Sequence, residues 1–267
     1  MMSSRKDWTL AVSVGFAVVT DGEKLDELRN AGITEIELSS GDFRPFFEYD
    51  YFEKSVEIFE FAKAHGVNIS SVHLPFAPFS MIDGTDPQND LFTVKLQTMI
   101  MDAAAKSGIK IAVIHPSGEP YKDDERAERL KRGCEVISRL TENAEKLGIQ
   151  LALENLPRAC LCRDHDEMLY FLERIPNLKV CFDMNHNLSE DNEEYIRAVG
   201  DKIITLHVSD YDFEDERHWL PGKGKVDWKR MVEVLEDVGY KGRFLYEISW
   251  KDVTYEDVAE NYKKLLG

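Results

Sequence analysis

The sequence predicts an α/β protein with the fold of a (β/α)8 barrel, also called a TIM barrel. Strand-like and helix-like patterns alternate eight times along the chain, which is typical of β–α units around a parallel sheet. Six of the strand-like segments end in His, Asp or Glu. The chain has 267 residues, close to the roughly 250 residues of one such barrel, and its composition does not shift along its length. We therefore expect a single domain over residues 1–267.

Each apolar run that could form a strand is followed by a segment with helical periodicity. The expected strands are residues 9–14, 33–38, 67–73, 110–115, 150–154, 178–183, 203–208 and 243–248. The expected helices lie near residues 23–31, 52–65, 90–107, 124–147, 164–174, 191–199, 227–238 and 254–265. Glycines such as Gly32 and Gly148 directly follow helical segments, where a left-handed C-cap is expected. Eight such pairs favour a closed barrel over a doubly wound sheet, which more often stops at about five or six strands.

Side chains that can bind a metal or move a proton stand at the carboxyl ends of six expected strands. They are His73, His115, Glu154, Asp183, His207 and Glu247. Side chains alternate between the two faces of a strand. The residues two positions earlier are mostly small or apolar: Ser71, Val113, Ala152, Cys181, Thr205 and Leu245. This pattern predicts a packed interior beneath a polar layer at the C-terminal mouth, where such barrels hold their active sites. Glu37 ends the second strand at the same level and is a candidate for contact with a substrate or with His73.

Four of these side chains form a donor set suited to one divalent cation. Glu154, Asp183, His207 and Glu247 end four consecutive strands, and three carboxylates with one imidazole suit Mn²⁺, Co²⁺, Zn²⁺ or Mg²⁺. A cation there would polarise a carbonyl or generate hydroxide. Two glutamates facing each other across a substrate could also serve as the base and acid of a proton transfer. The residue pattern alone fits either chemistry.

Two long loops follow the third and seventh strands on the same face of the barrel. They are residues 74–89, with Phe76 and Phe79, and residues 209–226, with Trp219. Long loops in compact domains are usually functional or disordered, and these apolar side chains could cover a substrate. The second loop also contains Gly222-Lys223-Gly224-Lys225. Because barrels often bind phosphate with the loops after strands seven and eight, this segment is a candidate for a phosphate site.

The charge and composition narrow the range of partners. The formal net charge is −17, which disfavours binding to nucleic acid and to anionic membranes. No apolar run approaches the roughly 20 residues of a membrane span. Residues 9–19 resemble the apolar part of a secretory signal, but no small-residue cleavage site follows and the barrel needs its first strand there. The four cysteines lack zinc-finger or CxxC spacing, so we expect reduced thiols in a cytoplasmic protein.

Seven segments, in order over nearly the whole chain, resemble the xylose isomerase-like TIM barrel superfamily. They are VHLPF at 72–76, IAVIHPSG at 111–118, LALENLP at 151–157, CFDMNH at 181–186, ITLHVSD at 204–210, RHWLPGKGKVDW at 217–228 and YEIS at 246–249. That superfamily contains isomerases and epimerases of sugars and sugar phosphates, with endonuclease IV enzymes as distant relatives. The resemblance therefore implies an enzyme that acts on a small carbohydrate.

The resemblance also implies roles for individual residues. Glu154, Asp183, His207 and Glu247 match the ligands of one divalent metal, which holds the carbonyl and adjacent hydroxyl of a ketose or sugar phosphate. Glu154 and Glu247 match the pair that moves a proton through an enediolate. His186 and Arg217 match positions that bind substrate oxygens. His73, His115, His218 and Glu37 are further candidates for contact with the substrate.

Other activities share this residue set. In the endonuclease branch, His73 and His115 would ligate additional zinc ions, and His186 and His218 would complete a third zinc site. Here, however, Glu216-Arg217-His218 replaces the Asp-x-His of that branch. A dehydratase of an inosose or a dehydroshikimate-like compound would use the same metal and base. A non-catalytic sugar-binding barrel is expected to lack one of the four main ligands, and none is missing. The sequence does not fix the substrate, the metal or the oligomeric state, and a homo-oligomer is compatible with it.

Overall fold

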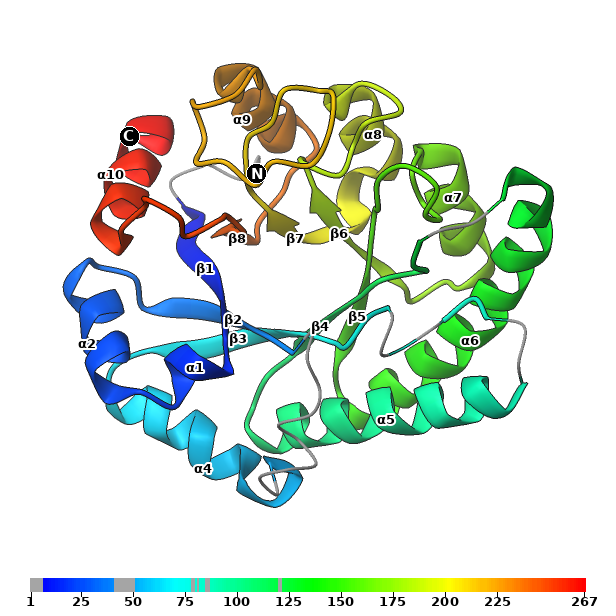
Figure 1. Cartoon of the computed structure of the whole chain (residues 1–267), viewed down its shortest axis with the longest axis horizontal. Helices are drawn as coiled ribbons and strands as arrows, with labels where there is room; N and C mark the ends of the chain where they lie inside the picture. The colour runs from blue at the N-terminus through cyan, green and yellow to red at the C-terminus, as the bar shows by residue number, and fades with distance from the viewer. Residues whose placement is uncertain (1–6, 41–50, 78–79, 81, 85–86, 120–121) are drawn as a thin grey trace.

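The computed structural model describes residues 7–40, 51–77, 80, 82–84, 87–119 and 122–267, so Phe79 lies outside the described residues. Eight parallel strands form a barrel with helices around it (Figure 1). The strands are β1 (Thr9–Gly15), β2 (Glu35–Ser39), β3 (Asn68–His73), β4 (Ile111–Ile114), β5 (Gln150–Glu154), β6 (Lys179–Asp183), β7 (Ile203–His207) and β8 (Arg243–Tyr246). Each expected strand is present, which confirms the predicted fold.

Closure of the barrel depends on the seam between β7 and β8. The hydrogen-bonded order is β7-β6-β5-β4-β3-β2-β1-β8, and a parallel bridge between Val208 and Tyr246 joins the two ends. There, the Val208 amide donates to Leu245 O at 2.8 Å and the Glu247 amide donates to Val208 O at 3.2 Å. Val208 and Glu247 lie just beyond the ends of β7 and β8, so these bonds hold the segment that carries Glu247 against β7.

Helices surround the sheet in the predicted order (Figure 1). The main ones are α2 (Gly22–Asn30), α4 (Tyr51–Ala64), α5 (Pro87–Lys106), α6 (Arg126–Leu147), α7 (His165–Arg174), α8 (Asn192–Val199), α9 (Trp228–Asp237) and α10 (Tyr255–Leu266). Short helical turns also form at α1 (Phe16–Val19), η2 (Asp123–Glu125) and η3 (Gly200–Lys202). Side chains such as Asp21 and Thr254 accept backbone hydrogen bonds at helix starts, which satisfies amides that have no partner within the helix. Gly148 ends α6 in the left-handed conformation, as predicted.

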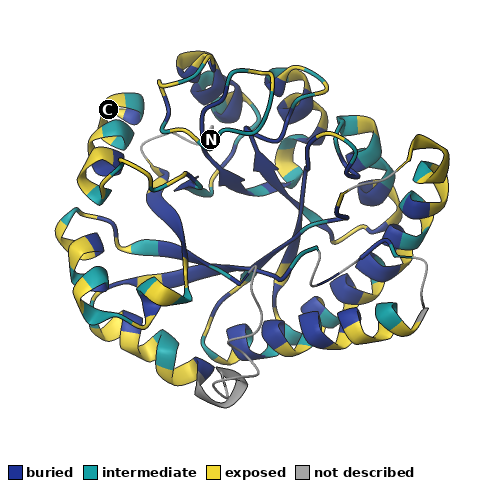
Figure 2. Ribbon diagram, viewed as in Figure 1, coloured by how far each residue is buried: buried dark blue, intermediate teal, exposed yellow. Residues whose placement is uncertain are grey.

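The core has two parts. Most buried apolar side chains lie between the sheet and the helices, and Figure 2 shows the strands almost entirely in the colour of buried residues. A separate small cluster of Val113, Ala152 and Cys181, with Ile204 against it, fills the inside of the barrel. The six residues that precede the polar strand ends by two positions are all buried. The packed interior therefore supports a polar layer above it. Within the described residues, every helix is too short or too polar to cross a bilayer.

Candidate active site

Glu154, at the end of β5, is the central side chain of the polar layer. Its Oε2 lies 3.0 Å from His73 Nε2 and 3.2 Å from His115 Nε2. Its Oε1 lies 3.0 Å from His207 Nδ1 and 3.3 Å from His186 Nδ1. Glu154 is fully buried, with 0% exposure. One carboxylate thus contacts histidines from β3 and β7 and from the segments after β4 and β6, as the strand-end pattern suggested.

Three carboxylates surround a single nitrogen of His207. Its Nδ1 lies 3.0 Å from Glu154 Oε1, 3.1 Å from Glu247 Oε2 and 3.8 Å from Asp183 Oδ2. One ligand atom from each of these four residues lies within 4.8 Å of the other three. Asp183 Oδ2 is buried and has no hydrogen-bond partner, although a buried polar atom is normally paired. An acidic donor set with an unpaired buried oxygen fits a divalent cation, as the sequence suggested.

Two asparagines that the sequence reading did not single out hold this arrangement in place. The Asn155 side chain donates to Asp183 O at 2.8 Å and accepts from the Asp183 amide at 2.7 Å. Asp183 Oδ1 accepts from the Asn185 amide at 2.6 Å, which leaves Oδ2 toward the cluster. Asn185 Oδ1 in turn accepts from the amides of Arg217 and His218. The signal for both asparagines was their place directly after strand-end ligands, in LALENLP and CFDMNH.

Burial and ion pairing shift the pKa values of the ionisable groups in this cluster in opposite directions. Burial raises the pKa of Asp183 to about 6, against the opposing effect of His186. The pKa of His186 rises to about 10, because its interactions with Asp183 and Glu154 outweigh the effect of burial. Burial would raise the pKa of Glu154 and of Glu247, but His207 holds the pKa of both carboxyls below their ordinary value. Both glutamates are therefore ionised at neutral pH.

A cavity of about 650 Å³ lies above the polar layer. Of the residues predicted for the site, His73, His115, His186, His218 and Glu247 line it. Glu154, Asp183 and His207 are fully buried next to this floor. Phe76, Leu156 and Pro157 provide apolar wall, and Glu119, Arg158 and Glu216 provide charged wall. The arrangement offers a molecule in the cavity several imidazoles below and mixed contacts at the sides.

Glu37 and Arg217 were candidates for contact with the substrate, but neither residue lines the cavity. Glu37 has 0% exposure and contacts the far nitrogen of His207, with Oε1 3.0 Å from Nε2. Arg217 does not line the cavity, because its Nε donates to Asp212 Oδ2 at 2.8 Å. The arginine on the cavity wall is Arg158, which sequence reasoning missed. Its only signal was its position directly after the LALENLP segment.

Further groups among the described residues could hold metal ions, and two of them each include a pair of histidines outside the main set. One is His73, His115 and Glu154, and the other is His186, Glu216 and His218. Within each group, one ligand atom per residue lies within 4.8 Å of the others. Glu216 thus stays near His186, with Oε1 3.8 Å from Nε2, although it replaces an aspartate of the endonuclease pattern. Glu216 also accepts from Arg158 Nη2 at 3.1 Å, so it is already paired with a cation.

Comparison with known proteins adds to this geometry. The profile of the xylose isomerase-like TIM barrel family matches residues 25–266. The chain belongs to the xylose isomerase-like TIM barrel family. One uncharacterized protein of Methanocaldococcus jannaschii is 26% identical to this xylose isomerase-like chain, over 62% of this chain and 66% of its own length. A second uncharacterized protein of the same organism is 27% identical, over 64% of this chain and 61% of its own length. A D-psicose 3-epimerase of Enterocloster bolteae is 23% identical over 84% of the chain and 75% of its own length.

Solved structures agree on the architecture of this xylose isomerase-like barrel. The crystal structure of a D-tagatose 3-epimerase-like protein matches it with a TM-score of 0.78 at 20% identity, over 96% of this chain and 97% of the other. At that identity the match supports the fold, and the fold agrees with the family assignment.

Proposed function

We propose that this protein is a divalent-metal-dependent isomerase or epimerase of a ketose. The observation that carries the proposal is that Glu154 and Glu247 both approach His207 Nδ1, at 3.0 Å and 3.1 Å. Glu247 lines a cavity large enough for a sugar, and Glu154 is buried next to its floor. The epimerase activity named for the Enterocloster bolteae relative supports the same reaction class. Interconversion of ketoses by proton transfer needs two groups that exchange a proton with adjacent carbons or opposite faces of one carbon.

Glu154, Asp183, His207 and Glu247 would hold the metal. One ligand atom from each lies within 4.8 Å of the others, and Asp183 Oδ2, a buried oxygen that makes no hydrogen bond, supports a role as a metal ligand. When bound, a divalent cation would supply Lewis-acid polarisation of the substrate carbonyl, which makes the neighbouring C–H bond more acidic.

Glu154 and Glu247 would move the proton. His207 lowers the pKa of both carboxyls, so both are ionised and able to accept a proton. One glutamate removes the proton beside the carbonyl to give an enediolate of the sugar. The other glutamate, once it has taken up a proton from solvent, gives that proton to the opposite face or to the neighbouring carbon, and the first glutamate then releases its proton to solvent. Glu247 lines the cavity directly.

Histidines would orient the sugar above the carboxylates. His73 Nδ1 lies 2.9 Å from Leu74 O, which assigns the ring proton to that side and fixes the ring. His115, His186 and His218 line the cavity nearby. Burial lowers the pKa of His115, so that imidazole is neutral at pH 7 and can bind sugar hydroxyls as donor or acceptor.

The deciding experiment is a metal analysis followed by a ketose assay. Protein purified without chelators or metal-affinity resin should contain about one equivalent of manganese, cobalt, zinc or magnesium per chain. Incubation with a panel of ketoses in deuterated water should then incorporate deuterium next to the carbonyl. A metal-loaded protein that exchanges no proton on any ketose would contradict the proposal.

The geometry also supports a second candidate, a zinc-dependent phosphodiesterase of the endonuclease IV kind. The supporting observation is the presence of the two additional groups His73–His115–Glu154 and His186–Glu216–His218 beside the main cluster. The net charge of −17 opposes binding to DNA. Two to three equivalents of zinc, with cleavage of abasic-site DNA, would favour this candidate over the isomerase.

A further inference from the structure

The charged wall of the cavity is dominated by carboxylates. Among the described residues that line it, Arg158 is the only Lys or Arg, whereas Glu119, Glu216 and Glu247 are acidic. His186 also lines it, and its Nδ1 faces Glu154 and Asp183 at 3.3 Å and 3.6 Å. Resting on the proposed function, we propose that the cavity selects ketoses without a phosphate or carboxylate group. The part of the substrate that extends beyond the reacting carbons would present hydroxyl or amine donors to Glu119 and Glu216.

The positive charge of Arg158 is neutralised by ion pairs within the protein. Its Nε lies 3.1 Å from both carboxylate oxygens of Glu119. Its Nη1 donates to Asp215 Oδ1 at 2.8 Å, and its Nη2 donates to Glu216 Oε1 at 3.1 Å. All three guanidinium nitrogens therefore face carboxylates, and the group as a whole is net negative. A phosphate that approached Arg158 would also approach three acidic side chains.

The glycine- and lysine-containing loop after β7, which suggested a phosphate site, has its own buried anion. Asp210 is fully buried, and its carboxylate accepts from the amides of Gly222 at 2.7 Å and Val226 at 3.1 Å. Trp228 Nε1 donates to the same carboxylate at 3.0 Å. Asp210 thus occupies the position in which backbone amides of a phosphate loop would hold an anion.

Backbone amides of that loop, and the side chain of Lys225, also have partners within the protein. The Lys223 amide donates to Leu220 O at 3.0 Å and the Lys225 amide donates to Tyr211 O at 2.8 Å. Lys225 Nζ lies 3.6 Å from Glu214. Residues 222–226 do not appear among the residues that line the cavity. Packing explains why residue 224 is glycine, because a Cβ there would lie 2.3 Å from Asp210 Oδ1.

The volume of the cavity can hold a substrate larger than a free sugar. A volume of about 650 Å³ is in the middle of the range of roughly 300–1,000 Å³ for small-molecule sites, and a single ketohexose fills only part of it. Phe76, Leu156 and Pro157 give the wall an apolar surface between the histidines and the rim. The side chains of Glu119 and Glu216 are 32% and 27% exposed, so their remaining lone pairs can accept hydrogen bonds from a substrate.

Three ligands that differ only in the group on the terminal carbon test this selection. A ketohexose, the same sugar with a phosphate on its terminal carbon, and the same sugar with an amine there would be titrated into the metal-loaded protein at low salt. The phosphate ester should bind at least about tenfold more weakly than the neutral sugar, whereas the amine should bind as tightly or more tightly. Equal or tighter binding of the phosphate ester would overturn the inference and leave the proposed function intact. If none of the three sugars binds, the proposed function fails, and the inference fails with it.

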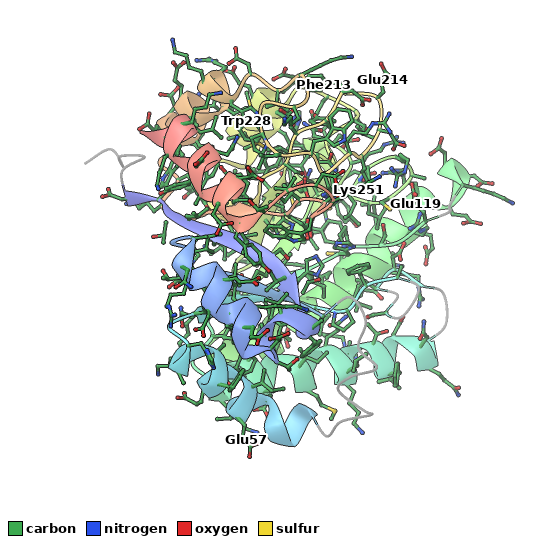
Figure 3. All side chains as sticks on the ribbon, turned by 60° about the vertical axis from the view of Figure 1, so that its left-hand side comes forward. Glu57, Glu119, Phe213, Glu214, Trp228 and Lys251 are labelled. Carbon is green, nitrogen blue, oxygen red and sulfur yellow. The ribbon has the colours of Figure 1, made fainter. Side chains whose placement is uncertain are left out.

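A pair of variants distinguishes the effect of charges on the cavity wall from the effect of the net charge of the whole protein. Glu119→Gln removes one negative charge from the wall but keeps an oxygen for Arg158 and for the Ala159 amide. Glu57→Gln removes the same charge from α4, and Figure 3 shows Glu57 and Glu119 far apart on the molecule. At low salt, Glu119→Gln should reduce the preference against the phosphate ester by about three- to fivefold, and Glu57→Gln should leave it unchanged. Equal effects of the two variants would show that the wall does not set the preference.

Discussion

Glu37 contacts the nitrogen of His207 that faces away from the other carboxylates: Glu37 Oε1 lies 3.0 Å from His207 Nε2. Ser71 Oγ donates to the other oxygen of Glu37 at 2.8 Å, and both Glu37 and His207 are fully buried. Because the Nε2 proton is directed to Glu37, Nδ1 is the nitrogen that faces Glu154, Asp183 and Glu247. A carboxylate behind a histidine ligand fixes its tautomer and strengthens it as a donor to metal.

The Glu37→Gln variant should therefore bind metal more weakly. We expect a loss of about 10- to 100-fold in affinity, because glutamine keeps the hydrogen bond but lacks the charge. Competition with a chelator measures this without any substrate. Glu35→Gln serves as the control, because Glu35 is on the same strand and pairs with Arg243. Equal affinities of the two variants would rule out a positioning role for Glu37.

The substitutions Glu154→Gln and Glu247→Gln should each reduce turnover by at least about 100-fold. Each removes a carboxylate that can carry a proton while keeping a similar shape. Both residues are also proposed metal ligands, so metal content must be measured in the same samples and restored by excess metal. Glu214→Gln, whose side chain is 73% exposed, is the control. Near-normal activity of Glu154→Gln or Glu247→Gln on the true substrate would refute the two-glutamate mechanism.

Metal affinity should rise with pH. In the protein without metal, burial raises the pKa of Asp183 to about 6, and the neighbouring carboxylates raise the pKa of His207 despite its burial. Below about pH 6 both groups hold protons, which a metal ion must displace, so affinity falls as the pH falls through that range. Calorimetric titrations in two buffers with different ionisation enthalpies should detect proton release. Binding without proton release at pH 6 would contradict the expectation.

The positions of the strand-end residues could be predicted because they depend on local rules. His207 and Glu247 follow from strand alternation and from the common direction of parallel strands, which the sequence shows directly. The position of Arg158 depends on a left-handed backbone, with φ of 53°, and on carboxylates from two other loops. The contact between Glu37 and His207 joins residues that are 170 positions apart. Such long-range contacts leave no periodic signal in one sequence.

The Gly222–Lys225 segment is another case in which the sequence alone was not enough. Its motif fitted a phosphate-binding loop, but in the structure the loop packs around the carboxylate of Asp210. Gly224→Ala should destabilise the protein by about 1–3 kcal/mol, because the added Cβ would lie 2.3 Å from both Asp210 Oδ1 and Tyr211 O. Gly15→Ala is the matched control, since a Cβ at Gly15 meets nothing within 4 Å and its φ of −90° suits alanine. Denaturant unfolding of both variants measures the difference. If Gly224→Ala were as stable as Gly15→Ala, the close packing of this loop on Asp210 would be refuted, and with it the reason for assigning the loop amides to that carboxylate.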